Sequence, residues 1–212
     1  MVSLRLYLAR FLRLTLITLL ALPLIGASLW FLFLRLYGPP VAQALAREAV
    51  VDRVLPDGTI LDDAGRSCPR EAVSFIELRV LSDGKDYIGH AFLHWPRATI
   101  GFCTDEENIG LIDYLLPWSG TSPGYLRDDT EQCFDYVRRY CACPSTIEQL
   151  EIAVIAHADD PYQVGNWRGG MNCATWATHR LRDAGLSPPE GDCPNRLARQ
   201  MTPWVSEIKN GH

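Results

Sequence analysis

Cys173 is the residue of this sequence best placed to act as a nucleophile. It stands in the first turn of a predicted helix that runs from about Asn172 to Gly185. Unpaired backbone N–H groups and the helix dipole stabilise an anion at this position, which lowers the pKa of a thiol there. A thiolate that attacks a carbonyl also needs a basic or cationic partner. The sequence therefore predicts thiol chemistry at Cys173, with a histidine as its partner.

The histidines differ in how well they can serve as that partner. The five are His90, His94, His157, His179 and His212. His179 lies six residues further along the same helix, about 240° around its axis, so it points away from the thiol. His157 lies near the end of another predicted helix, and one more histidine occupies the last position. His90 and His94 share one strand face about 13 Å apart, so one thiol cannot contact both. Gly89 lets another backbone approach closely, which favours His90.

Hydrophobic patterning predicts a β-rich region that is followed by two helices. The predicted strands cover residues 49–55, 59–61, 72–81, 87–95, 98–103 and 132–143. Asp-Gly pairs at 57–58 and 83–84 are typical of hairpin turns, and residues 104–130 have the composition of a loop. Ser145 opens a capping box before a helix that continues to about Ala158. The second helix ends before a glycine. The pattern indicates an α+β domain.

Three motifs occur in an order that matches one group of enzymes. They are Gly-His-Ala-Phe at residues 89–92, Asn-Cys-Ala-Thr-Trp at 172–176, and Tyr162 about ten residues before the cysteine. This arrangement resembles the circularly permuted papain-like cysteine hydrolases, which include NlpC-type amidases and lecithin-retinol-acyltransferase-like proteins. In that group the histidine precedes the cysteine. The resemblance covers about residues 87–186.

The resemblance implies both a fold and a mechanism. The fold is α+β, with an antiparallel sheet packed on the nucleophile helix. Cys173 corresponds to the nucleophile and His90 to the base, and Asn172 and Tyr162 would shape the site or its oxyanion-binding region. The implied reaction is acyl transfer from an amide, ester or thioester to water or another acceptor. It requires no metal or cofactor.

The resemblance leaves the residue that orients the imidazole open. In such enzymes this polar group usually comes from the strand that follows the histidine. Here that strand and its end offer Thr99, Thr104 and Asp105, and the sequence does not choose among them. Asp128 and Asp129 are predicted to form a solvated turn. A Cys-His dyad is also sufficient in principle, because cysteine needs less activation than serine.

The N-terminal region has the composition of a membrane anchor. Residues 14–34 form a run of 21 residues without a charge, and about 20 apolar helical residues span a bilayer. Cleavage after Ala44-Leu45-Ala46 is the alternative, although these residues lie well past the apolar run. The predicted division is a tail and single transmembrane helix at 1–36, a linker at 37–46 and a hydrolase domain at 47–212 with its core at about 72–186.

The arginines on the two sides of the anchor nearly balance, so they do not determine its orientation. The cysteine content is the remaining indication of the compartment. The cysteines are Cys68, Cys103, Cys133, Cys141, Cys143, Cys173 and Cys193. If one stays a reactive thiol, the other six can form up to three disulfides, which is unusual in a reducing cytosol. The sequence contains no C-x-x-C pair, which makes a zinc site less favoured. We therefore expect the domain on the periplasmic side of the inner membrane.

Charge narrows the possible functions. The whole chain has a formal net charge of −5, and residues 1–36 contribute four arginines and no acidic residue. The strongly acidic remainder is a poor nucleic-acid binder. The expected function is a membrane-anchored thiol hydrolase that cleaves peptidoglycan peptide amides or lipid-like acyl bonds. The alternatives are a catalytically silent, disulfide-stabilised binding module on the same fold, and a toxic effector of the same hydrolase class. The sequence identifies no protein partner.

Overall fold

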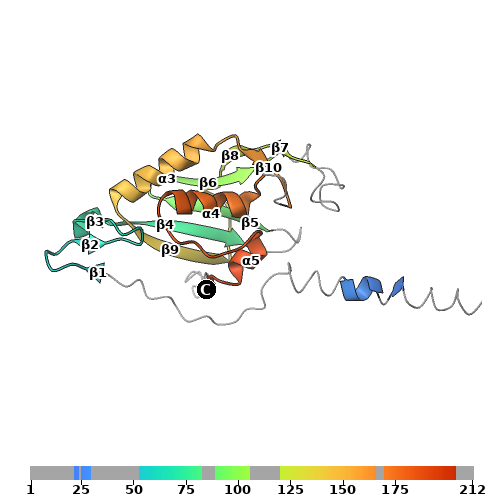
Figure 1. Ribbon diagram of the computed structural model, residues 1–212, viewed down its shortest axis with the longest axis horizontal. Coiled ribbons are helices and arrows are strands. Elements are labelled where there is room, and N and C mark those ends of the chain that lie inside the picture. Colours follow the sequence, from blue (N-terminus) through green and yellow to red (C-terminus); the bar gives the residue numbers. More distant parts are fainter. Residues whose placement is uncertain are drawn as a thin grey trace, which may run out of the picture. The chain divides into compact units, whose positions relative to one another are not determined.

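The computed structural model describes residues 22–23, 25–29, 53–82, 89–105, 120–165 and 170–203 (Figure 1). The chain divides into two compact units, Met1–Gly38 and Pro39–His212. In the first unit, residues 22–23 and 25–29 are helical. Most of the predicted anchor at 14–34, and all of the predicted linker, lie outside the described residues. Among the described residues, no helix combines the length and apolar character needed to cross a membrane.

An antiparallel sheet of six strands is the centre of the second unit. The strands, in spatial order, are β11 (Thr202–Pro203), β9 (Tyr136–Ala142), β4 (Ser74–Leu81), β5 (His90–Trp95), β6 (Ala98–Cys103) and β8 (Tyr125–Asp128). Strand β4 is central, because it pairs with β9 on one side and with β5 on the other. Strands β5, β6 and β8 then follow in register, with His94 opposite Thr99 and Gly101 opposite Arg127.

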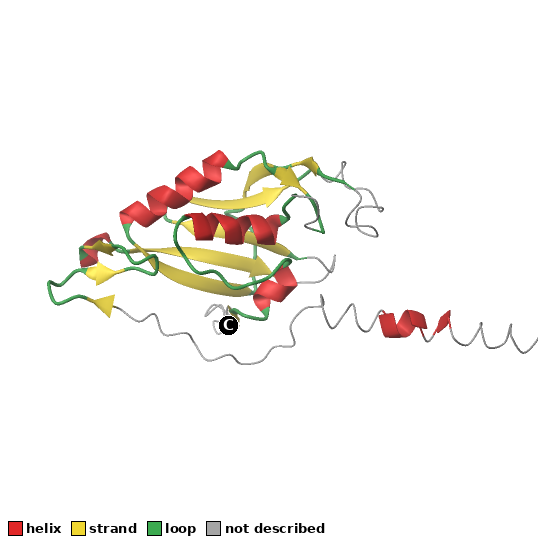
Figure 2. Cartoon of the chain, viewed as in Figure 1, coloured by secondary structure: helices red, strands yellow, loops and turns green. Residues whose placement is uncertain are grey.

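Three helices pack on one face of this sheet (Figures 1 and 2): α3 (Pro144–Ala156), α4 (Cys173–Asp183) and α5 (Pro194–Ala198). Side chains alternate along a strand, so one set faces the helices. The sheet contributes the buried side chains Ile76, Leu78, Val80, Ala91, Leu93 and Trp95 to the core. Leu150 of α3 and Trp176 and Leu181 of α4 fill the other side of it. The result is an α+β fold of two layers, as the sequence predicts.

Short strands complete the second unit. A three-stranded sheet comprises β1 (Arg53–Val54), β2 (Ile60–Leu61) and β3 (Ser67–Cys68), and a 3-10 turn follows at Arg70–Ala72. Gly58 in the β1–β2 turn has φ +84°, which confirms the predicted hairpin. A separate pair joins β7 (Ser122–Pro123) to β10 (Pro161–Tyr162). A disulfide links Cys68 to Cys143, the residue before α3.

Two details differ from the sequence prediction. Residues 104–130 are not all loop, because β7 and β8 lie within them. Helix α3 starts at Pro144 rather than after a Ser145 cap, since proline suits the first helical position and needs no N–H partner there. The predicted turn at 83–84 lies outside the described residues, but β4 and β5 on either side of it pair antiparallel.

Candidate active site

Helix α4 begins at the predicted nucleophile because Asn172 caps it. The Asn172 side-chain oxygen accepts hydrogen bonds from the N–H groups of Ala174 and Thr175, each at 3.0 Å. The Thr175 hydroxyl accepts in return from the Asn172 N–H, at 3.0 Å, which completes a capping box. At the far end, Gly185 has φ +87° and closes the helix, as predicted. The cap fixes Cys173 as the first helical residue.

Two loops, one before α4 and one before α5, hold the Asn172 side chain in place. The Asn172 side-chain amide donates to the carbonyl of Val164 at 3.1 Å and to that of Asp192 at 2.6 Å. Two residues after Asp192, Pro194 lies beside Gly89, directly before the predicted base: a Cβ on Gly89 would come within 3.1 Å of the Pro194 Cβ and would collide with the carbonyl oxygen of Leu81. Gly89 also has φ +69°, so glycine is required there on two grounds.

His90 begins β5, and its imidazole lies close enough to Cys173 to interact with the thiol. The backbone N–H groups of Ala91 and Ala174 also stabilise the ionised sulfur. The imidazole Nε2 is bonded to the Asp129 carboxylate, so the ring nitrogen that faces the sulfur is Nδ1. The structure therefore brings together the two residues that the sequence selected from opposite ends of the domain.

Asp129 follows β8 and is the third member of this group. Its Oδ2 lies 2.6 Å from His90 Nε2, and its Oδ1 accepts from Arg127 Nε at 2.6 Å. Its backbone N–H donates to the carbonyl of Thr99 at 3.0 Å, which holds the residue beside β6. The carboxylate is only 2% exposed. Gly101 of β6 provides the space, because a Cβ there would collide with Asp129 Oδ2 and approach His90 Nε2.

The three residues expected to orient the imidazole do not do so. The Thr99 hydroxyl bonds to His94 Nδ1 at 2.8 Å instead. The Thr104 hydroxyl is buried with no hydrogen-bond partner within the described ranges, and Asp105 is exposed. The expectation that Asp129 belongs to a solvated turn is wrong.

Asp128 does behave as a turn residue, and this explains the error. It is exposed and accepts from the N–H and hydroxyl of Thr130, at 2.9 and 2.6 Å. Two adjacent aspartates thus have opposite roles, since neighbouring side chains in an extended segment point to opposite sides. The sequence gives little signal for Asp129. The strand before it, Tyr125–Asp128, has only four residues and lies in a segment rich in Gly, Pro and Ser, and its pairing opposite Gly101 appears only in the folded sheet.

The contacts within the group stabilise its charged forms. Burial by itself would lower the pKa of His90, but hydrogen bonds to Asp129 and Cys173 raise it to about 9. Burial opposes ionisation of Cys173, yet contact with His90 and the N–H donors lowers the pKa of the thiol. Burial likewise opposes ionisation of Asp129, and His90 and Arg127 outweigh it and lower the pKa of that carboxyl. The arrangement favours a thiolate–imidazolium ion pair with an ionised carboxylate behind it.

The two other residues expected in the site have packing or capping roles. Asn172 shapes the turn through its cap. The Tyr162 ring lies 5.6 Å from the ring of Phe102, and Phe102 stacks on Trp176 of α4 at 5.2 Å. This aromatic column supports the start of α4 from the β6 side.

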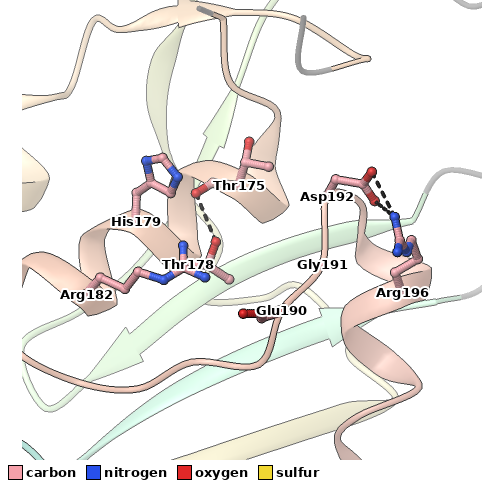
Figure 3. A pocket seen from close by; sticks show the side chains of 8 residues that line it. All are labelled: Thr175, Thr178, His179, Arg182, Glu190, Gly191, Asp192 and Arg196. Atoms are coloured by element: carbon pink, nitrogen blue, oxygen red, sulfur yellow. Dashed lines mark hydrogen bonds and ion pairs between the residues drawn. The ribbon is translucent and has the colours of Figure 1, made fainter.

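A pocket lies beside α4, away from this group (Figure 3). It has a volume of about 300 Å³ and is lined by Thr175, Thr178, His179, Arg182, Glu190, Gly191, Asp192 and Arg196. Figure 3 shows the Asp192–Arg196 ion pair at its rim and the Thr178 hydroxyl turned back onto the Thr175 carbonyl. The lining contains none of Cys173, His90 and Asp129.

Comparison of the chain with models of protein families, with curated proteins and with solved structures gives no match. Among the described residues, no three or more His, Cys, Asp or Glu side chains are grouped so as to hold a metal ion.

Proposed function

We propose that the protein is a cysteine hydrolase in which Cys173 is the nucleophile, His90 the general acid and base, and Asp129 the residue that orients His90. The observation that carries the proposal is the series of contacts from the Cys173 sulfur to the imidazole, and from the imidazole Nε2 to the buried Asp129 carboxylate at 2.6 Å. A nucleophile, a base and an orienting group in contact are the parts that thiol-dependent acyl transfer needs. Cys173 is also a free thiol, which a silent, bridged module would lack.

The proposed reaction has two halves. The Cys173 thiolate attacks an amide or acyl carbonyl, and the backbone N–H at the start of α4 stabilises the negative charge that develops on the oxygen. His90 Nδ1 donates its proton to the leaving group, and the acyl group remains on the sulfur as a thioester. His90 then removes a proton from water, which attacks the thioester and restores the thiol. Asp129 keeps Nε2 protonated throughout.

The order of elements supports a circularly permuted papain-like arrangement. The base precedes the nucleophile, the base stands on a sheet strand, and the nucleophile begins a helix that packs on that strand. The finer fold assignment is part of the proposal, because it depends on the resemblance of the motifs at residues 89–92 and 172–176.

We further propose that the enzyme works outside the cytoplasm at the inner membrane. The Cys68–Cys143 disulfide supports an oxidising compartment, and the apolar run at 14–34 supports a membrane anchor. Peptide amides of the cell wall are then the substrates within reach, and lipid-like acyl bonds are the variant. A toxic effector of the same chemistry would differ in destination rather than in the site.

The test uses the full chain purified in detergent. Iodoacetamide should label Cys173 near neutral pH faster than a free cysteine, as mapped by peptide mass, because contact with His90 lowers the pKa of the Cys173 thiol. The full chain should also cleave peptidoglycan fragments or acyl esters, and Cys173→Ala should abolish this. Cys133→Ala is the matched control, since Cys133 is exposed and not bridged. A Cys173 that does not react, or cleavage that survives Cys173→Ala, would overturn the proposal.

A further inference from the structure

We infer that Arg127 selects substrates whose leaving group carries a negative charge. The inference depends on the proposed function, because it concerns the half of the substrate that departs from Cys173. It assigns a role to a cation that the Cys173–His90–Asp129 group does not itself need for bond cleavage.

Arg127 lies next to the imidazole of His90. Its Nη2 lies 3.2 Å from His90 Nε2, on the side of the imidazole opposite the sulfur. His90 protonates the leaving atom from Nδ1, so the leaving group lies over the imidazole. A leaving group that continues past the ring in the direction of Nε2 reaches the guanidinium.

The Arg127 guanidinium is held in place by Asp129 but keeps N–H groups that can bind a further acceptor. Its Nε donates to Asp129 Oδ1 at 2.6 Å, and Asp129 is itself held by the Thr99 carbonyl. Nε2 of His90 directs its own proton at Asp129, so it does not accept one from Nη2. No other hydrogen bond of the Arg127 side chain occurs within the described part of the chain. The Nη1 and Nη2 hydrogens therefore remain for an acceptor, in the fork geometry that suits a carboxylate.

The charge that the site presents to solvent is that of Arg127. The signs alternate along the group: Cys173 negative, His90 positive, Asp129 negative and Arg127 positive. The carboxylate that would neutralise Arg127 is 2% exposed, whereas the Arg127 side chain is 43% exposed. The site is thus close to neutral in sum, but its accessible end on the leaving-group side is positive.

A pair of cell-wall-type peptides tests this. The two peptides share the acyl half and differ only in the leaving amino acid, which ends in a free carboxylate or in a carboxamide. We expect the ratio of their kcat/KM values, carboxylate over carboxamide, to fall roughly fivefold in Arg127→Gln. Arg127→Lys keeps the charge and should retain most of the ratio. Because both peptides meet the same thiolate and imidazolium, the ratio removes changes in their ionisation.

Arg127 also contacts Asp129, so a second measurement separates an effect on the leaving group from an effect on ionisation. Iodoacetamide carries no charge and releases iodide, so its pH profile in Arg127→Gln reports whether Cys173 stays reactive and how far the thiolate–imidazolium pair has shifted. The ratio for the two peptides is then compared at a pH where this pair is formed in both proteins.

The outcomes distinguish this inference from the proposed function. An unchanged ratio in Arg127→Gln, with Cys173 still reactive, overturns the role of Arg127 and leaves the hydrolase intact. A Cys173 that does not react with iodoacetamide overturns the hydrolase, and the inference with it.

Discussion

At the residue scale, the chemistry depends on contacts that overcome burial. Burial disfavours an ionised thiol and an ionised imidazole alike. Cys173 is only 2% exposed, so an isolated sulfur there would be a neutral thiol. The pKa values of Cys173 and His90 instead move towards the charged forms, because each charge stabilises the other. Cys103 is buried nearby, and its thiol pKa is raised to about 12, because burial outweighs the attraction of Arg127. Contact with a charged partner, rather than burial, distinguishes the two thiols.

This pairing predicts a bounded pH range for activity. The pKa of His90 is raised to about 9, so its imidazolium is intact at neutral pH and is lost as the pH rises through about 9. The pKa of Cys173 is lowered, so its thiolate is lost only as the pH falls through that lowered value. Hydrolysis should therefore fall above about pH 9, when the acid that protonates the leaving group disappears.

Asp129→Asn should narrow that range from its upper side. The variant keeps a side-chain oxygen as a hydrogen-bond acceptor for His90 but removes the negative charge that raises the His90 pKa. The upper limb of the pH–rate profile should move to lower pH, and hydrolysis on that limb should fall about tenfold for each pKa unit of the shift. Asp128→Asn is the neighbouring control and should behave as the native protein, since Asp128 caps a turn at the surface. A profile unchanged by Asp129→Asn would contradict the assigned role of Asp129.

Gly101→Ala tests the space that the group occupies. The added methyl group would meet Asp129 Oδ2 and His90 Nε2, so the carboxylate must move away from the imidazole. We expect hydrolysis to fall strongly while stability falls by about 1–3 kcal/mol, the usual cost of overpacking. Gly120→Ala has open space around its Cβ and should change neither quantity. Full activity in Gly101→Ala would show that the Asp129–His90 contact is dispensable.

At the element scale, the cap of α4 joins stability to reactivity. Asn172→Ala removes an acceptor for two N–H groups and leaves the carbonyls of Val164 and Asp192 without their donor. We expect a loss of about 1–2 kcal/mol in the free energy of unfolding, measured in urea. Asn172→Asp keeps the acceptor but adds a negative charge next to Cys173. It should raise the thiol pKa and shift the alkylation profile to higher pH. An unshifted profile in Asn172→Asp would contradict this link.

Helix α4 was predictable from sequence because both of its ends depend on local chemistry. Asn172 and Gly185 terminate it through contacts with their own neighbours, so the start and end follow from residue type. Asp129 was not predictable in this way. Its role depends on the pairing of β8 with β6 and on the absence of a side chain at Gly101, which leaves space for the carboxylate. Both are properties of the folded sheet. Local signals place Cys173 at the start of α4, and long-range pairing places Asp129 beside His90.

At the scale of the whole molecule, one covalent link encloses the sheet strands that carry the site. Cys68 and Cys143 are 75 residues apart, and β4, β5, β6, β8 and β9 all lie between them. The same junction has non-covalent support. The Asp62 carboxylate accepts from the Cys143 N–H at 2.9 Å and from the Thr146 hydroxyl at 2.5 Å. The native geometry at the start of α3 therefore does not depend on the disulfide alone.

The double variant Cys68→Ala/Cys143→Ala should accordingly fold but be less stable. A loop of this length restricts the unfolded chain by roughly 4 kcal/mol in the entropic account, and measured losses are commonly about 2–5 kcal/mol. Urea unfolding should show a loss in that range, with Cys133→Ala as the unbridged control. The Asp62 contacts should hold α3 in place, so the iodoacetamide rate at Cys173 should stay within about twofold of the native value under native conditions. A large fall in the iodoacetamide rate would mean that the disulfide also positions the site. A loss of less than about 1 kcal/mol in the free energy of unfolding would mean that the Asp62 contacts alone hold the junction together.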